Sequence, residues 1–220
     1  MVQIGALILD FGGPLLRTPF ELLRATERRL GLPRMTFDWR GPFDPDADPL
    51  WQRLLAGTIS EPEYWAARAA EFAAVTGTSG VRAMMGELFR GREDEIVRSE
   101  AIAAMRAARA LGCRVGVLTN DLTLFHDDEW VAGIRALAEA DAVVDAARLE
   151  VRKPDPAAYR MALDALAVTA PEAVFVDDQP VNVDGARAVG IAAVLFDVAR
   201  PAESFARALA LLEARLGRPV

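Results

Sequence analysis

The stretch that restricts the fold most is Val174-Phe175-Val176-Asp177-Asp178-Gln179-Pro180-Val181-Asn182. Its apolar beginning predicts a β-strand over residues 173–176 that is buried on both faces of a sheet. Two adjacent carboxylates, Asp177 and Asp178, close that strand. Like charges so close together favour a bound cation, and a purely structural use for them at a buried strand end is hard to find. The stretch therefore predicts a strand that carries a cation site at its carboxyl end.

Four more short apolar runs have the same character, and helical patterns lie between them. The runs are Gly5–Leu9, Arg114–Leu118, Ala142–Val144 and Ala192–Phe196. Asp155 and Pro156 are residue types that begin a helix, and a glycine such as Gly112 commonly follows the end of one. This alternation of strands and helices predicts an α/β fold with a mostly parallel sheet and right-handed crossovers.

The stretch between the first two strands has a different pattern. It predicts helices without core strands, at Pro19–Leu30, Pro49–Ala56, Glu61–Ala74 and Val81–Phe89. We therefore expect an α/β core made of residues 1–15 and 93–220 and an inserted helical module made of residues 16–92. Three tryptophans lie in that module, where they either line an apolar pocket or, more commonly for this residue type, pack in its core: Trp39, Trp51 and Trp65.

The overall composition excludes several classes of protein. The formal net charge is −7 and the pI is about 4.9, and no basic run is present, so a nucleic-acid or anionic-membrane partner is not expected. Cys113 is the single cysteine and cannot form an intramolecular disulfide, so the sequence does not indicate an oxidising compartment. The first residues lack a basic region, and their apolar run stops at Asp10, too short for a signal peptide or membrane span. We expect a cytoplasmic protein.

Two further kinds of site find no support. His126 is the only histidine, which excludes a zinc site built on several histidines, and it follows Phe125 outside any nucleophile-elbow context. Three aspartates in the helical module, Asp44, Asp46 and Asp48, have the spacing that opens a calcium loop. Proline and leucine, however, occupy the later positions that need a glycine and an acid, so we interpret this segment as a solvated loop.

Polar residues follow three other predicted strands. Asp10 ends the first strand in Leu7-Ile8-Leu9-Asp10-Phe11-Gly12-Gly13-Pro14, where it is either a ligand-binding carboxylate or a residue that caps its own turn. Thr119 follows the second strand in Leu118-Thr119-Asn120-Asp121, where its hydroxyl and the following N–H groups either hold phosphate oxygens or cap an ordinary loop. Ligands bind at the carboxyl ends of strands in open parallel sheets.

Lys153 stands in Arg152-Lys153-Pro154-Asp155-Pro156, directly before a predicted helix N-terminus. Its ammonium and the helix dipole would act together on one anionic ligand, although a solvated surface lysine is the default for this residue type. Each of these segments alone fits either a ligand-binding or a structural role. Together they favour a ligand-binding site, because a strand-end Asp, a hydroxyl, a lysine and a second acidic strand end occur in that order along the chain.

In these segments the chain resembles the haloacid dehalogenase-like hydrolase superfamily. The resemblance covers the whole chain and includes Asn182, Ala186 and Gly190 after the acidic pair. It implies a Rossmann-like parallel-sheet core, with the helical module corresponding to the cap that this superfamily inserts after its first motif. It also implies Mg²⁺ as the cofactor and a small, phosphorylated molecule as the substrate.

Carried over to this sequence, the resemblance implies a role for each matching residue. Asp10 is the nucleophile that forms an aspartyl intermediate, and Lys153 neutralises charge on the nucleophile and the phosphoryl group. Thr119 hydrogen-bonds the transferring group. The remaining residues that match are Gly12, Gly13 and Asn120 beside the phosphoryl group, Asp10, Asp178 and the carbonyl of Gly12 on the metal, and Asp177 and Asn182 in support of it.

Gly12 departs from the superfamily pattern. Phosphatases of this superfamily carry an Asp at that position as general acid/base, and loss of such a group costs about 10²–10⁴ in rate. One interpretation is a phosphatase whose proton comes from elsewhere, for example from Asp121, Asp46, Asp48 or water. The others are a dehalogenase-type hydrolase acting at carbon, which needs no proton but for which Asp178 is unusual, and a phosphate- or metal-binding protein without turnover. Substrate identity and oligomeric state are not encoded in any recognisable motif.

Overall fold

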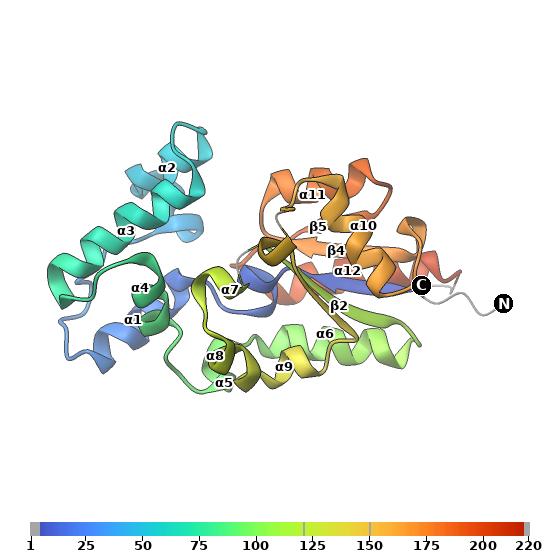
Figure 1. Cartoon of the computed structure of the whole chain (residues 1–220), viewed down its shortest axis with the longest axis horizontal. Helices are drawn as coiled ribbons and strands as arrows, with labels where there is room; N and C mark the ends of the chain where they lie inside the picture. The colour runs from blue at the N-terminus through green and yellow to red at the C-terminus, as the bar shows by residue number, and fades with distance from the viewer. Residues whose placement is uncertain (1–4, 121, 150, 218–220) are drawn as a thin grey trace. The chain divides into compact units, whose positions relative to one another are not determined.

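The chain forms a five-stranded parallel sheet flanked by helices (Figure 1). We analysed a computed structural model, which describes residues 5–120, 122–149 and 151–217. The strand order is β3-β2-β1-β4-β5, and every neighbouring pair is parallel. The strands are β1 (Ala6–Leu9), β2 (Arg114–Thr119), β3 (Ala142–Asp145), β4 (Ala173–Asp177) and β5 (Ala192–Leu195). The predicted α/β class with a Rossmann-like parallel sheet is confirmed.

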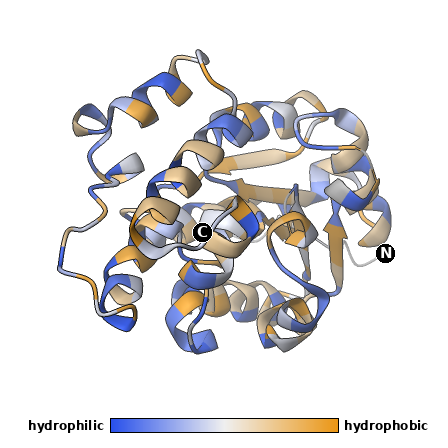
Figure 2. Ribbon diagram, turned by 60° about the vertical axis from the view of Figure 1, so that its left-hand side comes forward, coloured by the Kyte–Doolittle hydropathy of each residue, from blue (hydrophilic) through white to orange (hydrophobic). Residues whose placement is uncertain are grey.

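The central strands are as apolar and as buried as the sequence pattern requires. All four residues of β1 and all five of β4 are buried, and Figure 2 colours the strands mostly orange, the hydrophobic end of its scale. The register pairs Leu9 with Val117 on one side and with Val176 on the other. Consequently β1, β2 and β4 end at one edge of the sheet, and the polar residues that follow them are brought together there.

Helices cover both faces of this sheet. On one face α6 (Ser99–Ala110) packs beside α12 (Pro201–Arg215), and on the other α10 (Pro156–Ala165) packs beside α11 (Pro180–Ala188). Asp155 caps α10 by accepting a hydrogen bond from the N–H of Ala157, as predicted. Short helices complete the core unit: α5 (Glu93–Ile96), α7 (Leu122–Phe125), α8 (Asp128–Gly133) and α9 (Arg135–Ala138). Among the described residues, no helix is both long and apolar enough to cross a membrane.

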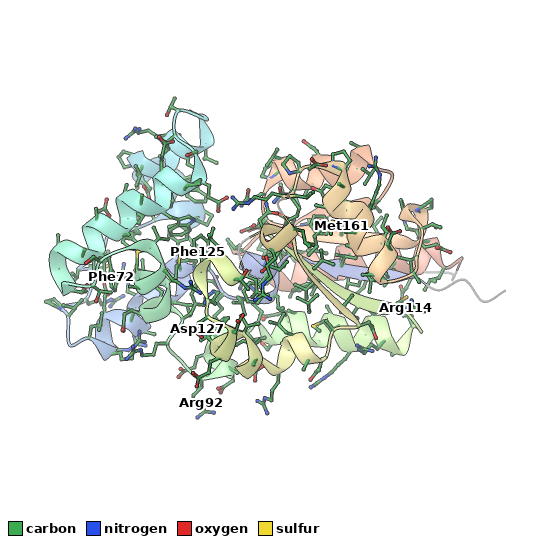
Figure 3. The ribbon with its side chains drawn as sticks, in the orientation of Figure 1. Phe72, Arg92, Arg114, Phe125, Asp127 and Met161 are labelled. Carbon is green, nitrogen blue, oxygen red and sulfur yellow. The ribbon has the colours of Figure 1, made fainter. Side chains whose placement is uncertain are left out.

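The chain divides into two compact units. One contains residues 1–17 and 93–220, and the other contains Thr18–Arg92. The second unit is helical, with α1 (Pro19–Arg29), α2 (Pro49–Leu55), α3 (Glu61–Thr76) and α4 (Val81–Leu88). These bounds lie within two residues of the helices expected from the apolar spacing. The aromatic core of this unit stacks Phe37 on Phe72, the latter labelled in Figure 3, with centroids 5.1 Å apart.

A buried ion pair organises the loop before α2. Nη2 of Arg68 lies 2.5 and 2.6 Å from the two carboxylate oxygens of Asp48, and both side chains are almost fully buried. Asp48 also accepts hydrogen bonds from the N–H groups of Gly41 and Trp51. Burial alone would raise the pKa of Asp48, but these N–H groups and the Arg68 charge lower it below its usual value. Asp48 is thus an ionised structural residue, which makes it a poor proton donor for catalysis.

Replacing Arg68 with Met is expected to destabilise the helical unit by about 3–5 kcal/mol, because it leaves the Asp48 carboxylate buried without its partner. The contacts of the guanidinium with the ring of Trp39, 5.3 Å away, are lost as well. Urea unfolding followed by tryptophan fluorescence measures the change. Arg53→Met, at an exposed position of α2, is the matched control and should unfold like the wild type. Equal stability of the two variants would contradict the structural role of the pair.

Candidate active site

Asp10 lies where β1 leaves the sheet. Its N–H donates to the carbonyl of Val176 in β4, 2.8 Å away, which continues the strand pairing up to the carboxylate itself. The residue is only 7% exposed. A carboxylate at this depth requires a cationic partner, because burying an unpaired charge is costly.

Lys153 is that partner. Its Nζ donates to Oδ1 of Asp10 at 2.5 Å and to Oδ2 of Asp177 at 2.7 Å. The lysine side chain is 1% exposed, and its Nζ lies 5.4 Å from the centroid of the Phe175 ring. One buried ammonium therefore joins the nucleophile predicted in the first motif to Asp177, the first residue of the acidic pair in the last motif. The sequence-based default of a solvated surface lysine does not hold here.

Asn120 holds the backbone of Lys153 in place. Its Nδ2 donates to the carbonyl of Lys153 at 3.0 Å, and its Oδ1 accepts from the N–H of the same residue at 2.8 Å. The resemblance implies a place for Asn120 beside the phosphoryl group, which stays a prediction. In the structure the Asn120 amide forms this two-point clamp, which fixes the lysine relative to the end of β2. Sequence spacing could not reveal the clamp, because the two residues are 33 positions apart.

Asp177 is anchored from the opposite side by α11. Nδ2 of Asn182 lies 3.1 Å from both carboxylate oxygens of Asp177, and the carbonyl of Asn182 accepts from the hydroxyl of Tyr159 at 2.7 Å. Tyr159 belongs to the apolar face of α10 in the sequence and was not predicted to support the site. The helices approach closely there, since a Cβ on Gly185 would lie 2.7 Å from the Tyr159 hydroxyl.

The electrostatics of the cluster reflect burial and crowding. Burial raises the pKa of Asp10 to about 7, with the neighbouring Asp177 acting in the same direction and the Lys153 charge opposing both. Burial alone would lower the pKa of Lys153, but Asp10 and Asp177 together raise it above its ordinary value. Lys153 is therefore charged at neutral pH, and an additional cation beside Asp10 would favour its ionised form.

The acidic residues around Lys153 fit a divalent cation. One carboxylate oxygen from each of Asp10, Asp177 and Asp178 lies within 4.8 Å of the others. Asp10 and Asp177 share the ammonium of Lys153, and Asp178 adds a third carboxylate within reach of both, a set of oxygen donors that suits an ion such as Mg²⁺. Gly13 helps to make room for this arrangement: its φ is +81°, and a Cβ there would lie 2.5 Å from Oδ2 of Asp178. The donor set is entirely oxygen, as Mg²⁺ prefers.

Thr119 and Gly12 lie at the same edge of the sheet. Thr119 is the last residue of β2 and is 2% exposed. Gly12 is exposed, and a Cβ built on it would meet only Oδ2 of Asp10, at 3.9 Å. The position of the usual general acid/base is thus open space beside the candidate nucleophile. Asp121, one of the proposed substitutes for that acid, lies outside the described residues.

An aromatic cluster packs behind the turn that follows Asp10. The ring of His126 stacks on Trp130 with centroids 3.8 Å apart, and the edge of Phe11 contacts both. Phe125, the last residue of α7, and Asp127 flank this histidine in the chain and are labelled in Figure 3, as is Arg114 at the amino end of β2. The single histidine is buried and packs against the rings of Phe11 and Trp130.

Comparisons with known proteins agree with this fold. The family model described as haloacid dehalogenase-like hydrolase matches residues 4–190, and the chain belongs to this family of hydrolases. Within it, the chain is similar to phosphatase MT3486 from Mycobacterium tuberculosis (strain CDC 1551 / Oshkosh). The two are 31% identical over 210 residues, which cover 89% of this chain and 88% of that protein.

Solved structures show the same architecture. The magnesium-bound structure of the HAD-hydrolase YfnB from Bacillus subtilis has a TM-score of 0.62 at 12% identity, covering 88% of this chain and 87% of that one. An L-2-haloacid dehalogenase from Xanthobacter autotrophicus has a TM-score of 0.55 at 21% identity, covering 88% and 77%. These similarities establish the fold.

Proposed function

We propose that this protein hydrolyses phosphate monoesters of small molecules with Mg²⁺ and an aspartyl-phosphate intermediate on Asp10. The observation that carries the proposal is the buried ammonium of Lys153, which links Asp10 to Asp177, with a carboxylate oxygen of Asp178 within 4.8 Å of both carboxylates. Similarity to a phosphatase over nearly the whole chain supports the same reaction class. Asp10, Asp178 and the carbonyl of Gly12 would hold the metal. When bound, Mg²⁺ would withdraw charge from the phosphoryl oxygens.

In the first half of the reaction, a carboxylate oxygen of Asp10 attacks phosphorus and the bond from phosphorus to the ester oxygen breaks. Lys153 holds Oδ1 of Asp10 and keeps the carboxylate in one orientation. Its positive charge also offsets negative charge that gathers on the phosphoryl group. The Thr119 hydroxyl at the end of β2 would donate to a phosphoryl oxygen. The departing oxygen leaves as the alkoxide and takes a proton from water, since Gly12 supplies none.

In the second half, water attacks the phosphorus of the aspartyl-phosphate, which releases inorganic phosphate and regenerates the Asp10 carboxylate. Asp177 stays bound to Lys153 and Asn182 throughout. The ammonium therefore keeps its position while the Asp10 carboxylate is bonded to phosphorus. The general base that usually activates this water is also missing, because the same residue would serve as acid in the first half and as base in the second, and that position is Gly12. We therefore expect a slow enzyme that prefers esters with acidic leaving groups.

The direct test is hydrolysis of an aryl phosphate by the purified protein, with Mg²⁺ and with a chelator. Mg²⁺-dependent release of inorganic phosphate is expected. Binding of inorganic phosphate or Mg²⁺ seen as a thermal shift, without any turnover of a panel of phosphate esters, would replace the proposal with that of a binding protein.

Gly12→Asp is expected to raise the rate on alkyl phosphates by at least about tenfold, because it restores a proton donor next to the nucleophile. Gly12 has φ −77° and ψ 135°, which any residue adopts, and the space for a side chain is open. The gain should be smaller for aryl phosphates, whose leaving groups need less protonation. Gly12→Asn is the matched control, similar in size but without a titrating proton. A folded Gly12→Asp protein with unchanged or lower activity contradicts the missing-acid argument.

A second candidate is hydrolysis at carbon, as in the dehalogenase whose fold this chain shares. Gly12 favours it, because halide leaves carbon without a proton. Asp178 favours the phosphatase, because a third carboxylate beside Asp10 and Asp177 suits a divalent cation, which hydrolysis at carbon does not need. Halide release from short 2-haloacids that is unaffected by a chelator would select the second candidate.

We further propose that the helical unit, residues 18–92, serves as a cap that selects the substrate, and that the enzyme acts in the cytoplasm. The first proposal is supported by the position of this unit in the chain, between the strand that carries Asp10 and the rest of the core. Exchange of the helical unit for that of a relative should change the preferred substrate without removing Mg²⁺ dependence.

A further inference from the structure

Arg98 is a buried arginine close to the site that the proposed mechanism does not use. It is the N-cap residue of α6 and is 2% exposed. Its N–H donates to the carbonyl of Leu15 at 3.0 Å, and one residue earlier Val97 forms an antiparallel bridge with Leu16. The backbone of Arg98 is therefore fixed against the segment that follows the Asp10 turn. Burying a guanidinium is costly, so a specific use for its charge is expected.

The side chain of Arg98 reaches the turn itself. Its Nε donates a hydrogen bond to the carbonyl of Gly13, and its guanidinium carbon lies 5.5 Å from the centroid of the Phe196 ring. The N–H of Phe196 in turn donates to the carbonyl of Asp177 at 2.9 Å. The guanidinium thus connects the turn after the nucleophile with the residue that follows β5, beside the acidic pair.

The carbonyl groups of the turn have different partners. The carbonyl of Asp10 accepts from the N–H of Leu15 at 3.3 Å, that of Phe11 accepts from Leu16 at 2.9 Å, and that of Gly13 accepts from Arg98. Gly13 has φ +81° and ψ −71°, the geometry of a γ-turn, in which the preceding carbonyl normally bonds the following N–H. The following residue is Pro14, which has no N–H. The Gly12 carbonyl is therefore left without the hydrogen bond that this turn usually forms.

We propose that Arg98 is a positioning residue for the metal site: by binding the Gly13 carbonyl, it holds the two-glycine turn in the conformation that leaves the Gly12 carbonyl for Mg²⁺. The inference rests on the proposed function, in which that carbonyl is a metal ligand. Without Arg98, the Gly13 carbonyl loses its donor, and the peptide groups around two glycines gain freedom that metal binding has to remove. The main consequence is weaker Mg²⁺ binding, with less effect on the chemistry once the ion is bound.

Calorimetric titration of the metal-free protein with Mg²⁺, well below the melting temperature of each variant, tests this. Arg98→Met is expected to raise the Kd for Mg²⁺ by about 10- to 100-fold, the usual effect of losing a group that supports a metal ligand. Arg98→Lys should give an intermediate Kd, because its ammonium can reach a carbonyl but lacks the planar contact with Phe196. Arg106→Met, at an exposed position of the same helix, should bind like the wild type. The kcat at saturating Mg²⁺ should fall much less than the affinity.

The outcomes separate the two proposals. Either Arg98 variant, folded and binding Mg²⁺ as tightly as the wild type, overturns the role of Arg98 while leaving the proposed function intact. Should Arg98→Met fail to fold, the comparison of Arg98→Lys with the wild type decides the matter alone. A wild-type protein that binds no Mg²⁺ overturns the metal site and, with it, the role of Arg98.

Discussion

Asp10→Asn should reduce phosphate-ester hydrolysis by at least about 10³-fold, to the level of a protein that only binds the ester. Asparagine occupies the same space but cannot form an aspartyl-phosphate, so the reaction loses its first covalent step. The fold should survive, because the substitution removes one of three crowded carboxylates and Lys153 keeps Asp177 at 2.7 Å. The measurement is single-turnover hydrolysis of an aryl phosphate at saturating Mg²⁺, with a melting curve for each protein.

The control is Asp164→Asn, which removes an exposed carboxylate from α10 and should leave both rate and melting temperature unchanged. Mass spectrometry adds a direct readout: the wild type quenched in acid should carry a phosphoryl group on the peptide that contains Asp10, and the variant should not. Full activity in a folded Asp10→Asn protein would show that another residue attacks phosphorus.

The sheet was predictable because burial on both faces leaves a signal in the sequence. Each strand found in the structure lies within one residue of an apolar run, as β4 shows: residues 173–176 were expected and Ala173–Asp177 were found. The long helices were predictable from their caps and apolar spacing. The turn at Phe11–Leu15 and the short helix α7 were not, since such segments depend on contacts distant in sequence.

The sequence predicted which residues form the candidate site, but not the hydrogen bonds and ion pairs between them. The ion pair of Lys153 and Asp10 spans 143 positions, and nothing in the local pattern sets its geometry. Composition does carry one signal for this residue: Lys153 is the only lysine among 25 lysine and arginine residues. A chain that otherwise uses arginine places a compact ammonium at a point where two carboxylates meet a single donor atom. Arg98 left no comparable signal, because it is one arginine among many.

The supports of Lys153 come from different elements and act on different atoms. Asn120 binds its backbone from the end of β2, while Asp10 and Asp177 bind its Nζ from β1 and β4. Each of the three strand ends therefore provides a residue that holds Lys153. The register of the parallel sheet brings these residues to the same place. Shifting any of the three strands by one residue would move its residue about 3.3 Å away from Lys153. The fold positions the site through strand register.

Lys153→Met is expected to lower both activity and stability, which distinguishes Lys153 from Asp10. Removal of a preorganised charge beside the transferring group should cost about 10²–10³ in kcat. In addition, Asp10 and Asp177 lose their buried counter-charge, which should cost about 3–5 kcal/mol in the free energy of unfolding of the core unit. Methionine preserves the apolar stem against Phe175, so the loss can be assigned to the ammonium.

Lys153→Arg sharpens the comparison, because it keeps the charge but changes its shape. A guanidinium is larger and planar, so fitting it into the buried space of the ammonium would displace Asp10 and Asp177 from the positions that Lys153 holds at 2.5 and 2.7 Å. We expect Lys153→Arg to recover part of the stability and little of the activity. Urea unfolding and aryl-phosphate kinetics, measured on both variants, give the two quantities. If Lys153→Met unfolded like the wild type, the ammonium would have to be solvated, contrary to its 1% exposure.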